Sequence, residues 1–192
     1  MRHKLFSFQV ISIQLSLILP INEGAVTVSL QFSIKVYKQY FNFACAHFMI
    51  FENGSREPLH GHNYRVEIQG KMPNLNDDMV FDFLNIKPIV KKLCDELDHR
   101  LLIPKFNKHL RIDEQEKNFV FTTPDGSEFS IPKTDALLID IENTSAERIA
   151  FYLNQKIRDN VWQDYNFKFQ ELSVEVEETP GQSAQYVHQE VL

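Results

Sequence analysis

The 192-residue sequence contains few cysteines and few glycines, and it has no excess of positive charge. Its two cysteines, Cys45 and Cys94, lie in apolar-patterned segments and do not make a disulfide framework, which favours reduced thiols and a cytoplasmic protein. Only six glycines against sixteen phenylalanines, with 43% hydrophobic residues, argue against disorder and favour a single packed domain. The net charge of −6 gives no general attraction to nucleic acid or to anionic membranes.

Long uninterrupted apolar runs are also lacking. Residues 5–21 are mainly apolar and follow three basic residues, as in a signal peptide, but Gln9, Gln14 and several serines interrupt them and no clear cleavage site follows. The run is too polar and too short for a membrane span. We therefore expect residues 1–30 to be an N-terminal extension (an added strand, a flexible segment or an over-long translated start) and residues 31–192 to form the domain.

Histidine is scarce as well, and three of the seven histidines fall between positions 41 and 64. His60 and His62 alternate with other residues in a pattern typical of a strand, so their side chains share one face, and His47 closes a similar alternation. Three neutral imidazoles on apolar faces, without a fourth ligand nearby, are typical of a zinc site that keeps one position open. The alternative is a set of hydrogen-bonded core histidines, because a His-x-His pair alone is a weak signal.

Apolar alternation predicts strands at both ends of the domain. A change of phase near Lys38 indicates a bulge within the first strand. A polar loop joins the first two strands as an antiparallel pair, which brings all three histidines to one end. The strands are expected over about residues 31–47, 60–69, 172–178 and 183–189.

Two amphipathic helices are predicted between these strand pairs. Apolar residues recur every three or four positions over residues 86–97, and this helix is capped by Asp82 or Asn85, with Pro88 favouring the later start. Thr144-Ser145-Ala146-Glu147 has the form of a capping box and predicts the start of the second helix. The order of elements predicts an α+β domain in which an antiparallel four-stranded sheet carries two helices on one face.

The segment at about residues 105–140 fits this plan least well and is interpreted as an insert. Residues 118–123 and 128–132 look like two short strands around Pro124-Asp125-Gly126, which predicts a hairpin. We expect this hairpin to be solvated at the edge of the domain.

Glu178 ends the apolar face of the strand over residues 172–178. An acid in that place is costly unless it meets a partner. Glu178 is therefore a candidate for holding a ligand rich in N–H donors, although an acid that turns into solvent at the strand end fits the pattern equally well.

Six motifs occur together over about residues 32–190. They are Phe43-x-x-x-His47, His60-Gly61-His62-Asn63-Tyr64, Met79-Val80-Phe81-Asp82-Phe83, Leu97-Asp98-His99, Asn143-Thr144-Ser145-x-Glu147 and Glu178-Thr179. In these motifs and their order the chain resembles the 6-pyruvoyl-tetrahydropterin synthase and 6-carboxy-tetrahydropterin synthase family. The resemblance implies the tunnelling fold, in which the sheets of several subunits join into a barrel, as a homotrimer or homohexamer with active sites between subunits.

The resemblance also implies roles for particular residues. The implied zinc ligands are His47, His60 and His62. The implied substrate-binding residues are Glu178, Thr144, Ser145 and Thr179. Of these, Glu178 would hold the guanidine-like edge of a pterin, since a carboxylate facing two parallel N–H donors makes a strong bidentate contact. Asp98 and His99 resemble the proton-transfer pair of the family, with Asp98 fixing the tautomer of His99.

One catalytic position departs from the common pattern of the family. Common members carry a cysteine four residues before the first histidine of His-Gly-His, and Arg56 stands there in this chain. Glu57 stands next to it, as in the type III subgroup, which is associated with forming 6-hydroxymethyl-7,8-dihydropterin from dihydroneopterin triphosphate for folate synthesis. The other interpretation of Glu57 is an exposed loop acid. Arg56 or nearby lysines are candidates for holding the triphosphate.

We therefore predict a zinc-dependent lyase that acts on 7,8-dihydroneopterin triphosphate and forms 6-hydroxymethyl-7,8-dihydropterin. Glu57 would accept a proton from the substrate side chain, and His99 would handle a second transfer. The alternatives are a 6-carboxy- or 6-pyruvoyl-tetrahydropterin synthase of the queuosine or biopterin pathway, and a non-catalytic pterin-binding homologue.

Overall fold

The computed structural model describes residues 31–190 and has the mixed α+β architecture that the sequence predicts. The proposed N-terminal extension, residues 1–30, lies outside the described residues. The elements, in chain order, are β1 (Phe32–His47), β2 (His60–Met72), α1 (Phe83–Leu97), β3 (Arg100–Pro104), β4 (Arg111–Glu114), β5 (Asn118–Thr122), β6 (Glu128–Pro132), β7 (Ala136–Ile139), α2 (Ala146–Tyr165), β8 (Glu171–Thr179) and β9 (Gln182–Gln189).

Within residues 31–190, the main sheet has six strands in the order β7-β3-β1-β2-β8-β9, so the predicted count of four was wrong. The four predicted strands are present and pair antiparallel, and the register of β1 against β2 shifts between Tyr37 and Asn42, where a bulge was predicted. The two additional strands, β3 and β7, pair in parallel at one edge. They are short, and β3 is largely buried, so they lack the alternation that reveals a strand in a sequence.

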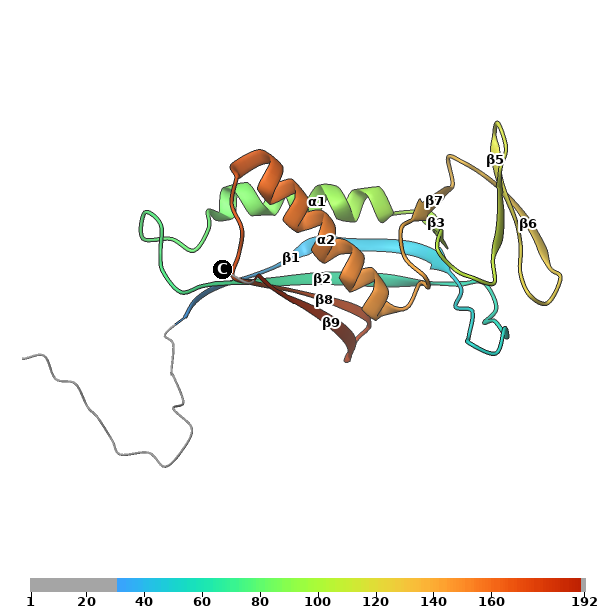
Figure 1. Ribbon diagram of the computed structural model, residues 1–192, viewed down its shortest axis with the longest axis horizontal. Coiled ribbons are helices and arrows are strands. Elements are labelled where there is room, and N and C mark those ends of the chain that lie inside the picture. Colours follow the sequence, from blue (N-terminus) through green and yellow to red (C-terminus); the bar gives the residue numbers. More distant parts are fainter. Residues whose placement is uncertain (1–30, 191–192) are drawn as a thin grey trace, which may run out of the picture.

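Helices α1 and α2 cover the same face of this sheet, as predicted (Figure 1). The main hydrophobic core lies between them and the strands, and the apolar stripe of α1 is buried in it. The stripe consists of Ile86, Ile89, Val90, Leu93, Cys94 and Leu97.

Helix α1 begins at the earlier of its two candidate caps, and α2 begins within the predicted capping box. Asp82 caps α1, because its carboxylate accepts the Leu84 N–H at 2.7 Å, and Pro88 therefore lies inside the helix. Ser145 caps α2 by accepting the Arg148 N–H at 3.4 Å. The Thr144 side chain does not serve as the cap, since its hydroxyl donates to a backbone carbonyl elsewhere.

The proposed insert, at about residues 105–140, contains the predicted hairpin, β5 and β6, and a third strand, β4, that completes a separate antiparallel sheet. This sheet lies at the end of the main sheet where β1 ends (Figure 1). The expectation of a solvated hairpin was wrong, because Phe121 is only 1% exposed and packs in a second hydrophobic cluster with Phe48 and Ile50. Burial of these apolar side chains holds the insert against the rest of the domain.

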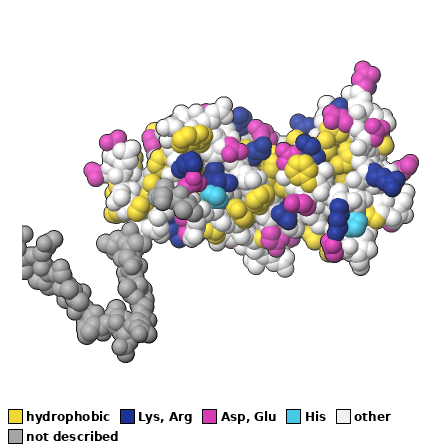
Figure 2. All heavy atoms as spheres, viewed as in Figure 1, with side chains coloured by type: hydrophobic (Ala, Val, Ile, Leu, Met, Phe, Trp, Pro, Cys, Tyr) yellow, Lys and Arg dark blue, Asp and Glu magenta, His cyan; other side chains and the backbone are white. Residues whose placement is uncertain are grey.

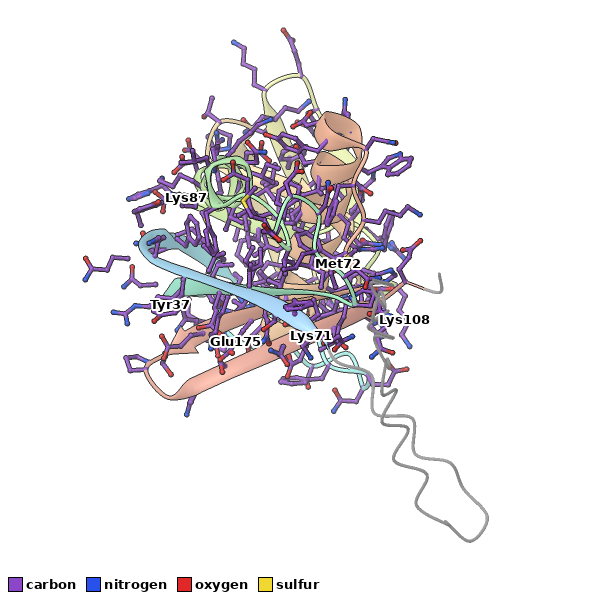
Figure 3. All side chains as sticks on the ribbon, turned by 90° about the vertical axis from the view of Figure 1, so that its left-hand side faces the viewer. Tyr37, Lys71, Met72, Lys87, Lys108 and Glu175 are labelled. Carbon is purple, nitrogen blue, oxygen red and sulfur yellow. The ribbon has the colours of Figure 1, made fainter. Side chains whose placement is uncertain are left out.

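The face of the main sheet away from the helices is polar. Tyr37 and Glu175 lie on this side, whereas Lys87 projects from α1 on the other side (Figure 3). Ion pairs between neighbouring strands cross this face, for example Lys35 with Glu67 at 2.5 Å. Basic and acidic side chains are interspersed over the surface seen in Figure 2. Within residues 31–190, no helix is long and apolar enough to cross a membrane.

Candidate active site

The register of β1 and β2 brings the three predicted histidines together. His47 lies directly opposite His60, and His62 follows on the same face of β2. Ligand nitrogens from the three rings all lie within 4.8 Å of one another, and the ring centroids are 4.5 to 5.3 Å apart. Two bonds of about 2 Å to a shared ion bring ligand nitrogens to within about 4 Å of each other, so only a small shift of the rings is needed. The three histidines therefore form a group that can hold a metal ion.

Gly61, between the two histidines of β2, allows β1 and β2 to approach closely. A Cβ atom at this position would lie 2.9 Å from the backbone carbonyl oxygen of Cys45. Because the obstacle is backbone, a side chain at Gly61 would displace β1 and with it His47. The glycine thus keeps the histidines of the two strands in register.

Backbone carbonyls orient two of the three rings. Nδ1 of His47 lies 3.0 Å from the Thr144 carbonyl oxygen, and Nδ1 of His60 lies 2.8 Å from that of Pro58. A carbonyl oxygen only accepts, so in each neutral ring the proton sits on Nδ1 and the Nε2 lone pair is free for a metal. Burial of His47, followed by the neighbouring His60 and His62, lowers the pKa of His47 and favours this neutral form.

Tyr64 extends the face of β2 that carries His60 and His62, and its hydroxyl joins the histidines to Glu178. The phenolic oxygen lies 3.0 Å from Nε2 of His47 and 3.1 Å from Oε1 of Glu178. The same carboxylate oxygen lies 3.5 Å from Nε2 of His62. Glu178 therefore lies beside the histidine group. A single phenolic proton cannot serve both acceptors, so a metal on His47 would leave it to Glu178.

The segment before α2 docks on the end of β1. The Asn143 side chain bonds both the N–H and the carbonyl of Ile50, at 3.2 and 2.9 Å, and the Thr144 hydroxyl donates to the Phe48 carbonyl at 2.7 Å. These bonds fix the Thr144 carbonyl that orients His47. Sequence reasoning missed the roles of Asn143 and Tyr64, although Tyr64 shares the alternation of His60 and His62.

The remaining predicted substrate residues have local partners in the single chain. The Ser145 hydroxyl caps α2, and the Thr179 hydroxyl donates to the side chain of Gln182 at 3.0 Å. Their contact with a ligand, like that of Thr144, stays a prediction.

Glu57 lies half-buried on the loop between β1 and β2, three residues before His60. Burial is the main cause that raises the pKa of Tyr64, and the nearby Cys45, Glu178 and Glu57 add to it, which places the Glu57 charge near the same hydroxyl. Arg56, a candidate for holding the triphosphate, has its Nε 3.0 Å from Oδ2 of Asp125 in the insert.

The Asp98 and His99 side chains bond to each other and to the backbone of β1. Oδ1 of Asp98 accepts the Ala44 N–H at 2.7 Å, and Oδ2 lies 2.9 Å from Nδ1 of His99. Burial opposes ionisation of Asp98, but these hydrogen bonds outweigh it and lower its pKa. The pair borders a hollow of about 840 Å³ that is also lined by Tyr37 and Glu175 on the sheet face away from the helices. Among residues 31–190, no hydrogen bond or ion pair joins Asp98 or His99 to the three metal-ligand candidates.

Neither cysteine has the properties of a nucleophile. Burial raises the pKa of Cys45 and of Cys94 to about 12, and the thiolate is the reactive form. The chain therefore has no activated thiol at this site.

Comparisons with known proteins agree on one family. The family model described as 6-pyruvoyl tetrahydropterin synthase matches residues 35–189. A putative 6-carboxy-5,6,7,8-tetrahydropterin synthase of Methanocaldococcus jannaschii is 35% identical over 148 residues, which cover 75% of this chain and 88% of that protein.

Solved structures of similar proteins extend the likeness to the fold. The 6-pyruvoyltetrahydropterin synthase of Plasmodium vivax is 35% identical, with a TM-score of 0.76 over 83% of this chain and 99% of that chain. The Plasmodium falciparum protein is 31% identical, with a TM-score of 0.75 over 83% of this chain and 98% of that one. Two further Plasmodium vivax structures are of mutants in which a catalytic glutamate is replaced by alanine or by cysteine.

Proposed function

The chain belongs to the 6-pyruvoyl tetrahydropterin synthase family, and from that premise we propose that it is a zinc-dependent lyase acting on 7,8-dihydroneopterin triphosphate. The observation that carries the proposal is the convergence of three histidine nitrogens within 4.8 Å, with Glu178 beside them. The adjacent strands β1, β2 and β8 thus carry both a candidate set of metal ligands and a carboxylate suited to the substrate.

The donor set fits zinc. Three neutral imidazoles with an open fourth position are typical of catalytic zinc sites, and the carbonyls behind His47 and His60 supply the outer hydrogen bonds that such ligands usually have. Zinc bound here supplies Lewis acidity toward the hydroxyl oxygens of the substrate side chain.

Glu178 is the proposed anchor for the pterin ring. Its carboxylate is suited to two adjacent N–H donors of the ring edge, and the Tyr64 hydroxyl holds it in place. Thr144, Ser145 and Thr179 are proposed to contribute further contacts to the substrate.

Two proton transfers are assigned to residues outside the metal ligands. Glu57 accepts a proton from the substrate side chain, and the similar Plasmodium vivax protein also has a catalytic glutamate. The Asp98–His99 pair handles the second transfer, with Asp98 holding Nδ1 of His99. Because one chain does not join this pair to the histidines, we propose that a neighbouring subunit of a homotrimer or homohexamer in the cytoplasm supplies it.

Two products are candidates, each favoured by a specific observation. The names of the curated relatives favour 6-carboxytetrahydropterin, so the comparisons support this alternative better than the product predicted from the sequence. Glu57, with no activated thiol nearby, favours 6-hydroxymethyl-7,8-dihydropterin. The two products differ in mass, because the single side-chain carbon is an acid in one and an alcohol in the other.

Product analysis tests the proposal. The zinc-loaded protein is incubated with 7,8-dihydroneopterin triphosphate, and the products are identified by mass spectrometry. We expect loss of the triphosphate-bearing carbons from the substrate, at a rate that depends on zinc. Tight pterin binding with turnover no faster than the zinc-free background would contradict the enzyme assignment and favour a binding protein.

A further inference from the structure

The insert packs on the segment that carries the proposed proton acceptor. Phe48, directly after His47, is fully buried, and its ring stacks on Phe121 and Phe129 with centroids 5.7 and 6.0 Å away. Offset aromatic packing of this kind restricts relative motion of the two segments. The insert and the start of the β1–β2 loop therefore share one hydrophobic cluster.

The turn between β5 and β6 binds Arg56, which lies on the loop between β1 and β2. Nε of Arg56 donates to Oδ2 of Asp125 at 3.0 Å, and Nη2 donates to the Ser127 hydroxyl at 3.2 Å. The guanidinium also lies over the Phe129 ring, 5.4 Å from its centroid. The Arg56 side chain is only 16% exposed, so these contacts are less screened by water than those of an ordinary surface pair.

Hydrogen bonds within the β5–β6 turn hold the Asp125 carboxylate in place. Its Oδ1 accepts the Thr123 hydroxyl at 2.6 Å and the Ser127 N–H at 3.0 Å. These hydrogen bonds, with the charge of Arg56, lower the pKa of Asp125 to about 2. The turn thus presents a charged carboxylate in one orientation at neutral pH.

Arg56, held by the turn, also bonds the backbone of Glu57. Nη1 of Arg56 donates to the backbone carbonyl of Glu57 at 3.0 Å, and the Glu57 N–H donates to the Met49 carbonyl at 2.9 Å. Both backbone polar groups of Glu57 are therefore bonded. A proton acceptor needs such support, since a misplacement of about 1 Å can cost a large factor in rate.

We propose that the insert is a clamp for the Glu57 loop and that Arg56 is a positioning residue that acts on catalysis through Glu57. The activity part of this inference rests on the proposed function of Glu57. It differs from a triphosphate-binding role for Arg56, because a positioning residue alters kcat whereas a residue that binds the substrate tail alters KM.

Hydrogen exchange tests the clamp without reference to activity. Arg56→Ala and Asp125→Ala are compared with Lys133→Ala, a matched control that removes another ion pair of the insert, with Glu114. We expect amide exchange in segment 51–59 to become roughly tenfold faster in the first two variants and to stay unchanged in the control, because local opening is opposed by the clamp bonds. Exchange that stays unchanged in all three variants overturns the clamp.

Kinetics then test the positioning role. We expect kcat to fall roughly tenfold in Arg56→Ala and Asp125→Ala at unchanged KM and zinc content, and the Arg56→Ala loss to vanish in a Glu57→Gln background, since coupled residues are not additive. A rise in KM alone, or an equal loss in both backgrounds, overturns the role. If the wild-type protein forms no product at all, the proposed function fails, while the exchange result still decides whether the clamp exists.

Discussion

The buried hydroxyl of Tyr64 lies 3.1 Å from Oε1 of Glu178, so the strand that carries two of the histidines also holds the candidate substrate anchor. A Tyr64→Phe variant keeps the ring and loses this bond. We expect neopterin binding to weaken by about tenfold or more, because a hydrogen bond to a charged group contributes about 1.5–3 kcal/mol. Fluorescence titration of zinc-loaded protein measures the change.

Tyr186→Phe serves as the control for that experiment, because Tyr186 is on β9 and packs against Phe151 away from Glu178. Equal neopterin affinities in wild type and Tyr64→Phe would contradict the role of the Tyr64 hydroxyl.

Replacement of Glu57 tests the proposed proton acceptor. Glu57→Gln keeps the shape of the side chain and removes its basicity, so we expect kcat to fall by about 10²-fold or more while zinc stays bound. Glu52→Gln, on the same loop, removes an exposed acid that pairs with Lys108 and is expected to leave kcat unchanged. Steady-state kinetics, together with analysis of bound zinc, measure the change. Full turnover by Glu57→Gln would exclude Glu57 as the proton acceptor.

Gly61→Ala tests how the strands hold the histidines. The added methyl group meets the Cys45 carbonyl at 2.9 Å, and we expect a loss of about 1–3 kcal/mol in unfolding free energy, together with weaker zinc binding. Gly126→Ala is the comparison, because Gly126 has a φ of 82° in open space and the substitution costs backbone strain alone. Weakened zinc binding only in Gly61→Ala is the predicted outcome; equal zinc affinity in both variants contradicts it.

The lowered pKa of His47 predicts a pH dependence for the metal-free protein. Between the folded pKa and the unfolded value near 6.5, the unfolded state binds more protons, so stability falls as pH falls below about 6.5. The slope due to one group is at most about 1.4 kcal/mol per pH unit. Urea denaturation with a chelator at pH 7.5, 6.5 and 5.5 should show a shallower decline for His47→Gln than for wild type, and parallel curves would refute the assignment.

The histidine group was predictable because its geometry depends on short-range patterns. A period of two places His60 and His62 on one face, and an antiparallel pair with a polar loop sets His47 against them. The same period contains Tyr64, whose position was predictable, while its contact with Glu178 depends on the pairing of β2 with β8.

Other features depend on contacts that no local pattern encodes. Strands β3 and β7 are short and parallel, and the burial of Phe121 depends on Phe48, more than 70 residues earlier in the chain. The expected solvated hairpin was wrong for this reason. Alternation in one strand also gives no information on where α1 ends, so the bonds of Asp98 to Ala44 and His99 could not be predicted from it.

Zinc titration tests the central claim most directly. Metal-free wild-type protein, and the variants His47→Gln and His188→Gln, are dialysed against the same free zinc concentration, and bound zinc per chain is measured by elemental analysis. We predict one zinc per chain in wild type and in His188→Gln, whose side chain contacts Arg158 and Glu190 instead, and little or none in His47→Gln. A wild-type chain without zinc, or a His47→Gln chain with a full complement, would contradict the claim.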